Sequence, residues 1–355
     1  MYHILTDRQT DRQTDRQTDR QTERNYTLDC FKGILMILVV IRHVLQYSVL
    51  DEGGILTNLI WAIQMPGFML VSGYFVARPS NKIGKAIEKS CERYLLPFLS
   101  WWILICVLLL GRCDRNIITG LNTLFHNVDG GLWFLWVVFA LSVLAAFVNR
   151  IISSNEKKFK KIVLSFITCC VYFGVLLIVV VLYRDVSMFG IKYILYYSVF
   201  YGFGFILRWT ENVWKPYWQN LKNHVVFISF IIFLAIIFNY DLYHCEDGLL
   251  SIMLRCITGF AGNLVLYNTV ERFQEILSKI KFPWIGKYTL EIYATHMLVN
   301  NLFTVSNKNI FWSTEGFVNF TVSLICTCVF TVIIISVFKS IPLANFLMYG
   351  KRDEK

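Results

Sequence analysis

The chain has 355 residues, of which 56% are hydrophobic and 16% are charged, and it carries a formal net charge of +10 at pH 7. With a mean hydropathy of +0.52, this composition excludes a soluble globular domain and indicates a polytopic membrane protein. The cations gather on alternate loops, as membrane topology requires, so the charge gives no support to a nucleic-acid partner.

The first 27 residues form a polar tail that is predicted to be disordered, in which Thr-Asp-Arg-Gln occurs four times from Thr6 to Gln21. The nucleotides ACAGACAGACAG encode this peptide, so a tetranucleotide repeat read through three frames would produce it. Gain or loss of one repeat unit would shift the reading frame. The tail therefore supports the hypothesis of a slippage-prone switch of expression, that is, phase variation; the alternative is an ordinary polar linker.

Ten apolar segments follow the tail, and they predict an all-α bundle of about ten transmembrane helices in residues 28–340, with a short tail at 341–355. The segments are 28–50, 55–77, 93–111, 131–149, 162–183, 189–208, 224–240, 249–268, 285–304 and 317–338. Lysine and arginine concentrate in the two tails and in the even-numbered loops, whereas acids prevail in the first, third and seventh loops. Both termini are therefore predicted to face the cytoplasm, and the protein to lie in the cell inner membrane.

Lys32 and His43 lie in the first span, eleven residues apart on one face of the predicted helix and about 16 Å apart along its axis. Ionisable side chains inside a bilayer are costly unless they are paired or hydrated, which favours a functional site. Asp29, one turn before Lys32, is expected to pair with the lysine. The alternatives are a lysine that extends to the membrane surface and a histidine that hydrogen-bonds between packed helices.

The second loop carries Lys82, Lys85 and Lys89 at helical spacing ahead of Arg93. These cations are predicted to line one face of a short amphipathic stretch. Such a face suits either lipid headgroups or the phosphates of a nucleotide-like cofactor, and composition does not decide between them.

Ten cysteines are present, but most of them fall in or beside the predicted spans. Cys113 and Cys245 are the two that are expected to reach the outer side. Because no CxxC spacing occurs, we expect neither a zinc site nor a structural disulfide.

Five motifs occur in order between residues 29 and 296. They are the basic residue, ten-residue spacer and histidine within Asp29–His43, the MPxFxxxSGY pattern within Gln64–Phe75, Arg93–Pro97 at the third span, Leu132–Leu135 at the fourth, and G-x-x-T-L-x-I-Y-x-x-H in Gly286–His296. Together they resemble the acyltransferase 3 family of integral-membrane acyltransferases, and within it the sugar O-acetylases related to fucose acetylases. The chain departs from the family pattern at Lys32, which is often arginine, and at Gln64, which is often histidine in the sugar-acetylase branch.

The resemblance implies transfer of an acetyl group from cytoplasmic acetyl-CoA, used as a co-substrate, to a hydroxyl of a cell-surface glycan or lipid-linked sugar, such as lipooligosaccharide, O-antigen or capsule. No permanently bound cofactor or metal is implied. Lys85, Lys89 and Arg93 would bind the donor at the cytoplasmic mouth, with Lys32 binding it or stabilising charge. The pantetheine arm would then extend toward His43.

His43 would act as a general base on the acceptor hydroxyl or as a transient acyl carrier. His296 would complete the site from across the bundle, or serve only as a hydrogen-bond partner in packing. Glu291 lies about 140° around the same helix from His296 and is expected to face the headgroups with Lys287.

Ser72 and Tyr74 flank a glycine in the second span, which indicates a close helix approach with a hydroxyl or amide near the thioester oxygen. Close packing alone also explains the glycine. Trp133 belongs either to the aromatic belt of the membrane interface or, with Asp129, to a platform on which a sugar stacks.

A transporter or flippase for a glycan or a small anion is the alternative function, because buried His43 and His296 would also suit proton-coupled transport. Such carriers often show inverted repeats, and no convincing repeat of that kind is found in the spans. A membrane scaffold without chemistry is disfavoured by the ordered motifs.

Overall fold

The computed structural model describes residues 25–352 except 81, 105–121, 123, 125, 127, 129–131, 183–187 and 246–247. The repeat tail, Cys113 and Asp129 therefore lie outside the described residues. The helices are α2 Tyr26–Ser48, α3 Ile55–Val76, α4 Ile83–Ser90, η1 Cys91–Leu95, α5 Leu96–Trp102, α7 Trp133–Ile152, α8 Lys158–Leu182, η4 Met188–Gly190, α9 Ile191–Trp209, α10 Glu211–Asn239, α11 Leu249–Arg272, α12 Gln274–Lys279, α13 Pro283–Lys287, α14 Thr289–Leu302, α15 Thr314–Ser340 and α16 Pro342–Tyr349. Within these ranges the chain forms no strand.

Six of the described helices, α3, α7, α8, α10, α11 and α15, are long and apolar enough to cross a membrane. The molecule is therefore a helical membrane protein. The count of ten spans and the cytoplasmic location of both termini stay predictions. The ninth predicted span, 285–304, is interrupted at Tyr288, and α14 after it has only 14 residues, about 21 Å of helix against a hydrocarbon core of about 30 Å.

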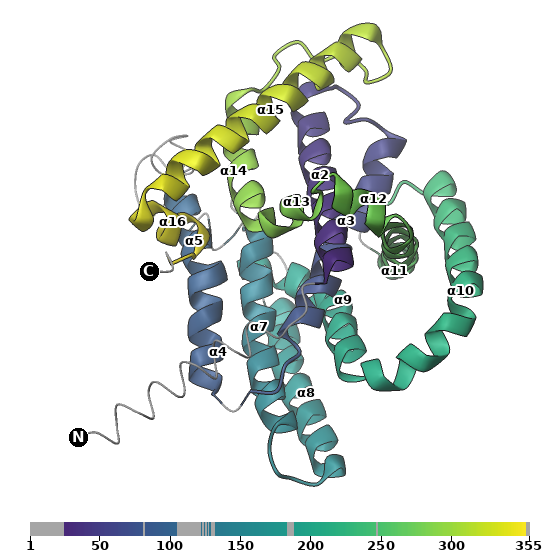
Figure 1. Cartoon of the computed structure of the whole chain (residues 1–355), viewed down its shortest axis with the longest axis vertical. Helices are drawn as coiled ribbons and strands as arrows, with labels where there is room; N and C mark the ends of the chain where they lie inside the picture. Colours follow the sequence, from purple (N-terminus) through teal and green to yellow (C-terminus); the bar gives the residue numbers. More distant parts are fainter. Residues whose placement is uncertain are drawn as a thin grey trace.

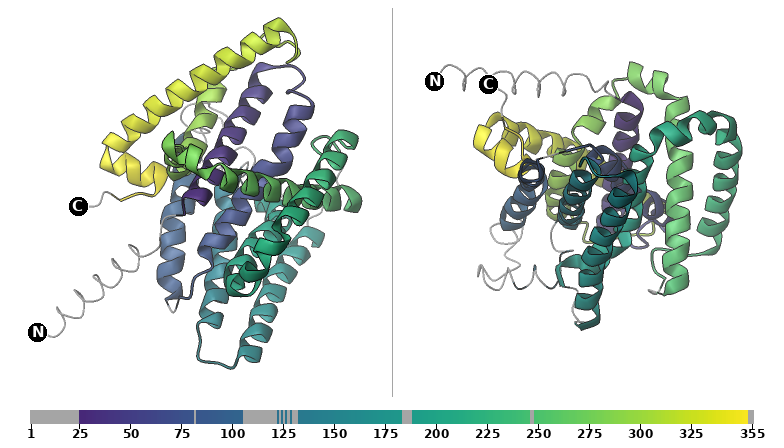
Figure 2. Two further views of the ribbon diagram at one scale, coloured as in Figure 1. Left: turned by 45° about the vertical axis from the view of Figure 1, so that its right-hand side comes forward. Right: turned by 90° about the horizontal axis from the view of Figure 1, so that it is seen from below.

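Helices α2 and α3 occupy the middle of the bundle (Figure 1). Helices α10 and α11 lie on one flank of this pair and α15 with α16 on the other, an arrangement that the views in Figure 2 also show. Helix α2 packs against α3, α11, α13, α14 and α15. Its N-terminus is capped by Asn25, whose side chain accepts a hydrogen bond from the Leu28 amide at 3.0 Å.

Helices α3 and α9 approach each other through glycines. A methyl group added at Gly73 would lie 1.9 Å from the Tyr201 carbonyl oxygen, and one added at Gly204 would lie 2.0 Å from the Leu70 carbonyl oxygen. Small residues at such positions let two membrane helices bring their backbones together. Close helix packing, which was one of the two explanations for the glycine between Ser72 and Tyr74, therefore accounts for Gly73.

We expect Gly73→Ala to separate α3 from α9 and to destabilise the protein by about 1–3 kcal/mol, because two backbones cannot yield as a side chain can. Gly202→Ala is the matched control, since a methyl group there meets nothing within 4 Å. Thermal unfolding of both variants in detergent checks the prediction. Equal midpoints for the two would contradict it.

Helices α4, η1 and α5 follow one another without a break, so the basic stretch on α4 continues directly into the third predicted span, which begins at 93, and is not a separate surface helix. The short π-helical turn η1 lies just before Pro97, the second residue of α5. Proline removes a backbone donor and crowds the preceding turn, which favours a wider turn there.

Only a short tail is predicted after the last span, yet residues 342–349 form a helix, α16, that packs against α5, α14 and α15. The indole nitrogen of Trp101 donates to the Met348 carbonyl at 2.8 Å. Tyr349 is buried, and its hydroxyl lies 2.9 Å from that of Thr295 on α14. Burial raises the pKa of the Tyr349 phenol, so this partner of Thr295 stays neutral.

Candidate functional site

The two predicted histidines come together between α2 and α14. His43 of α2 and His296 of α14 have ring centroids 5.2 Å apart and rings inclined by 48°. His296 is fully buried, and His43 is half-buried. Two helices that are far apart in the sequence therefore build one imidazole pair.

Hydrogen bonding fixes how His296 presents its ring. Its Nδ1 lies 2.9 Å from the Ile292 carbonyl oxygen, one turn earlier in α14. Because a carbonyl only accepts, Nδ1 carries the hydrogen of the neutral ring and Nε2 carries the lone pair. This buried Nε2 has no hydrogen-bond partner among the described residues. Few buried polar atoms in folded proteins lack a partner, which makes this nitrogen a candidate for contact with a ligand or a proton.

A charged network that the sequence analysis missed adjoins His43. Arg42 is 5% exposed; its guanidinium lies 3.3 Å from the Glu52 carboxylate, donates to the Tyr243 hydroxyl, and stands over the Tyr243 ring. Gln46 accepts from Arg42 at 3.0 Å and lies 3.4 Å from His43 Nδ1. Arg42 itself was the sequence signal for this network, because an arginine next to the histidine within an apolar span needs a polar or charged partner.

Lys32 and Asp29 form the expected ion pair at the start of α2, with the ammonium 2.8 Å from the carboxylate. The lysine side chain is 20% exposed, and its ammonium lies 5.3 Å from the centre of the Phe75 ring. Lys32 and His43 share one unbroken helix. The histidine pair therefore lies toward one end of α2 and this ion pair at the other.

The expectation that Glu291 faces the headgroups with Lys287 is wrong. Glu291 is fully buried, and its Oε1 lies 2.5 Å from the ammonium of Lys351, which follows α16. The other oxygen, Oε2, has no partner among the described residues. The C-terminal segment covers this part of α14, so the headgroup region is not open to the carboxylate.

Lys85 and Lys89 are exposed on α4, and Arg93 is exposed on η1, 5.6 Å from the centre of the Tyr94 ring. The helical spacing predicted for these cations is present. The backbone at Glu92 and Arg93 lies directly against Gly350, and Arg352 pairs with Glu92. Arg93 therefore lies close to the C-terminal segment, in which Lys351 pairs with the buried Glu291.

Ser72 and Tyr74 do not join the histidines. The Tyr74 hydroxyl lies 3.0 Å from the Arg208 guanidinium and 3.1 Å from the Glu211 carboxylate, at the junction of α9 and α10. Ser72 is half-buried on the same part of α3. The structure thus places Tyr74 with the Arg208–Glu211 ion pair at a helix end rather than with His43.

Trp133 stacks on two tyrosines of α9, with ring centroids 4.9 Å from Tyr193 and 5.2 Å from Tyr197. The next residue, Phe134, contacts Tyr293, which in turn contacts His296. A connected series of aromatic rings therefore leads from Trp133 to the histidine pair. Asp129, its predicted companion, lies outside the described residues.

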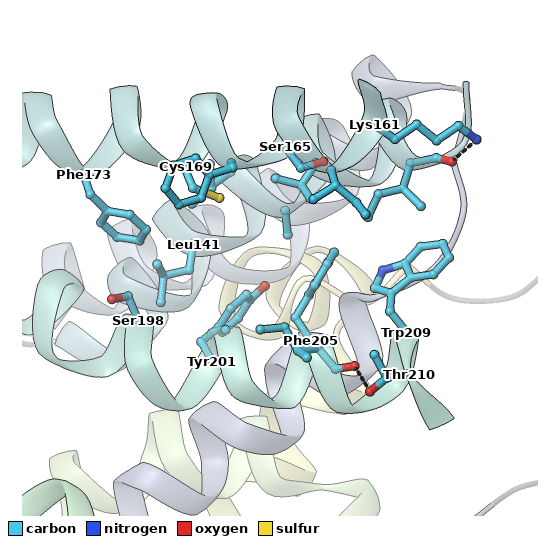
Figure 3. Close-up of a pocket in the computed structure, with 18 of the residues that line it drawn as sticks. Leu141, Lys161, Ser165, Cys169, Phe173, Ser198, Tyr201, Phe205, Trp209 and Thr210 are labelled. Carbon is cyan, nitrogen blue, oxygen red and sulfur yellow. Dashed lines mark hydrogen bonds between the residues drawn. The ribbon is translucent and has the colours of Figure 1, made fainter. Parts of the chain in front are cut away.

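A cavity of about 600 Å³ lies elsewhere, between α7, α8 and α9 (Figure 3). Side chains of α8 such as Phe173 point toward side chains of α9 such as Tyr201, and Lys161 closes one end by donating to the Ile152 carbonyl at 2.9 Å. None of the predicted site residues lines this cavity. Across the described ranges, no three His, Cys, Asp or Glu side chains gather as a metal site requires.

A family model described as an acyltransferase domain matches residues 25–339. Nodulation protein NolL of Sinorhizobium fredii (strain NBRC 101917 / NGR234) is 32% identical over 123 residues, which are 32% of this chain and 34% of that protein. The chain thus spans about a third of the length of this relative. Nodulation protein NolL of Mesorhizobium japonicum (strain LMG 29417 / CECT 9101 / MAFF 303099) is 23% identical over 355 residues, covering 91% of this chain and 90% of that protein. No solved structure matches.

Proposed function

Because the chain belongs to the acyltransferase 3 family of membrane acyltransferases, we propose that it lies in the inner membrane and transfers an acetyl group from cytoplasmic acetyl-CoA to a hydroxyl of a cell-surface glycan. The candidate acceptors are lipooligosaccharide, O-antigen, capsule or a lipid-linked sugar. Family membership makes the protein an acyltransferase, which sets the transporter or flippase aside.

The observation that carries the proposal is the imidazole pair, His43 and His296 at 5.2 Å. An imidazole is basic near neutral pH and suits proton transfer to and from a reacting hydroxyl. The hydrogen bond to Ile292 fixes the His296 ring, which presents a lone pair, whereas His43 is only half-buried. The pair supports His43 as the base, with His296 as a second imidazole beside it.

In this reaction His43 accepts the proton of the acceptor hydroxyl while the hydroxyl oxygen attacks the thioester carbonyl. The carbon–sulfur bond then breaks, the acetyl group remains on the oxygen as an ester, and the protonated imidazole returns the proton to the departing thiolate of CoA. In a second route the His43 ring nitrogen attacks the thioester carbonyl, the carbon–sulfur bond breaks, and the thiolate of CoA leaves with the ring proton. The acceptor hydroxyl then attacks this acetyl-imidazole, the nitrogen–carbonyl bond breaks, and the freed ring nitrogen takes the hydroxyl proton. Both routes end in the same ester and free CoA.

The geometry supports a donor that enters from the end of α2 that carries Lys32 and an acceptor that enters from the other side. Arg42, Glu52 and Tyr243 form a polar network beside His43 that suits the hydroxyl groups of a sugar. The rings that connect Trp133 to His296 offer faces on which sugars stack. One site would then receive the thioester and the glycan from opposite sides.

Inverted membrane vesicles that expose the cytoplasmic face provide the test. With acetyl-labelled acetyl-CoA outside the vesicles, we expect free CoA thiol to appear together with labelled glycan that gains one acetyl group. Vesicles without the protein are the control. Absence of both products, or thiol release with no acetylated glycan, would contradict the proposal.

The repeat tail, we propose, acts through the gene and not through the protein. Deleting Thr6 to Gln21 in frame should therefore leave glycan acetylation nearly intact, because a polar terminus of this composition tolerates truncation. Acetylation and membrane abundance of the deletion variant check this prediction. A large loss of activity at normal abundance would show a role for the tail itself, and invariant repeat numbers across many colonies would contradict phase variation.

A further inference from the structure

Three lysines from separate parts of the chain meet around one aromatic ring. The ring is that of Tyr288, which joins α13 to α14. The ammonium of Lys339, in the last turn of α15, lies 4.2 Å from its centre, that of Lys351 lies at 5.4 Å, and that of Lys287 lies at 5.8 Å. Tertiary packing, and not a sequence motif, therefore builds this lysine cluster, which we define as Lys287, Lys339 and Lys351.

The charge of the cluster is only partly balanced. Lys351 pairs with Glu291 at 2.5 Å. Neither Lys287 nor Lys339 forms an ion pair within the described ranges. Ammonium groups gathered around one ring repel one another, and the ring offsets only a small part of that repulsion. A bound anion of more than one negative charge would complete the arrangement.

An exposed aromatic face lies beside the cluster. Trp284 of α13 is 54% exposed, and its ring centroid is 4.5 Å from that of Tyr288. Aromatic side chains beside cations bind nucleotide bases by stacking while the cations bind the phosphates. The combination of three lysines, a tyrosine and an exposed tryptophan therefore matches a nucleotide better than it matches a simple anion.

The lysine cluster surrounds the start of α14, the helix that carries His296. Tyr288 and His296 are eight residues apart and are separated by about 12 Å of helix rise, within reach of an extended pantetheine arm. A Cβ at Gly286 would lie 1.9 Å from the Asp29 carbonyl oxygen, so α13 touches the part of α2 where Asp29 pairs with Lys32. The lysine cluster therefore lies beside the end of α2 that carries Asp29 and Lys32, and the histidine pair lies further along α2 and α14.

We propose that Lys287, Lys339 and Lys351 bind the phosphate groups of the acyl donor, and that Trp284 and Tyr288 pack against its adenine base. This inference rests on the proposed function, because it takes acetyl-CoA as the donor. It assigns the nucleotide end of the donor to α13, α15 and the segment after α16. The exposed cations of α4, Lys85 and Lys89, are then not the principal phosphate contacts.

The test uses the full-length protein in nanodiscs of phosphatidylcholine alone, so that no anionic lipid competes. Lys287→Gln/Lys339→Gln removes the two lysines that have no carboxylate partner among the described residues, and it leaves the Lys351–Glu291 pair intact. We expect the dissociation constant for acetyl-CoA to rise at least about tenfold. The dissociation constant for S-acetyl-pantetheine, which has no phosphate, should not change, so the preference for the full donor should fall by the same factor. At saturating donor, kcat should stay within about twofold.

Two matched pairs serve as comparisons. Lys157→Gln/Lys279→Gln removes the same charge from exposed loop and helix-end positions, and it should change the acetyl-CoA dissociation constant by less than about twofold. Lys85→Gln/Lys89→Gln should behave in the same way. Trp284→Leu should weaken binding of acetyl-CoA but not of S-acetyl-4′-phosphopantetheine, which lacks the adenosine.

Three results would overturn the inference: equal acetyl-CoA affinity in the Lys287/Lys339 variant and its charge-matched control, loss of affinity in the Lys85/Lys89 variant instead, or an unchanged preference over S-acetyl-pantetheine. If these lysines bound lipid headgroups instead, the Lys287/Lys339 variant would retain less phosphatidylglycerol from mixed nanodiscs but would bind acetyl-CoA normally. Failure of the proposed function differs from all of these, because the unsubstituted protein itself would then neither bind acetyl-CoA nor release its thiol.

Discussion

Replacing His43 with glutamine is expected to lower glycan acetylation by at least ~100-fold, the usual contribution of a positioned general base, while the protein still inserts and still binds acetyl-CoA. Glutamine keeps a hydrogen-bonding side chain of similar reach, so the 3.4 Å approach to Gln46 has a substitute. Glutamine has no basic nitrogen that could accept the proton of the acceptor hydroxyl. The loss should therefore appear in kcat and kcat/KM together.

A control for this experiment is His244→Gln, which changes an exposed histidine in the loop before α11. It should leave acetylation within about twofold of the unsubstituted protein, as an exposed ion pair contributes little. Near-normal acetylation by the His43 variant would make that histidine a packing residue and would refute its catalytic role. If the variant is folded and inactive, rapid quenching of the unsubstituted protein with labelled acetyl-CoA chooses between the routes, because label on His43 indicates an acyl carrier.

Replacing Lys351 with methionine is expected to destabilise the folded protein by about 3 kcal/mol, the lower end of the range for breaking a buried ion pair. The carboxylate of Glu291 would remain fully buried without its cation. The lysine itself is 39% exposed, which places the effect at the lower end. Thermal unfolding in detergent should show a lower midpoint, and less folded protein should accumulate in membranes.

The neighbouring pair supplies the control. Arg352→Met also removes one positive charge, but its partner Glu92 and the arginine are 28% and 68% exposed, so the effect should stay below about 1 kcal/mol. Adding Glu291→Gln to Lys351→Met should restore most of the lost stability, because it removes the uncompensated charge. A double variant as unstable as Lys351→Met alone would show that contacts of the lysine stem, and not charge, are responsible.

Hydropathy located the long helices because burial in lipid demands runs of apolar residues, whatever their tertiary partners. The start of α10 was less visible. The predicted span begins at 224, whereas the helix begins at Glu211. The stretch that contains Lys215 and Lys222 is helical, but it is too polar to be part of an apolar segment. Polar composition at a helix end conceals the boundary from any hydropathy pattern.

The candidate site was only partly predictable. Spacing placed Lys32 and His43 on one helix, and the Asp29 pair follows from local geometry. The contacts that complete the region join residues distant in sequence, as when Arg42 meets Tyr243, and no local pattern encodes them. The prediction for Glu291 failed for the same reason. It assumed that the start of α14 faces the headgroups, whereas the C-terminal segment packs over it and supplies Lys351.

The bond between Lys351 and Glu291 also has a consequence for biosynthesis. The two residues are 60 positions apart, so at about 5–20 residues per second the ribosome adds the lysine roughly 3–12 s after the glutamate. During that interval α14 presents an acid to the insertion machinery before its cation exists, and charge at such depth opposes entry into lipid. We therefore expect α14 to complete its insertion late, after α15 and α16 have been made. A nascent chain stalled before Lys351 should hold both histidines and yet leave α14 accessible to water-soluble labelling reagents.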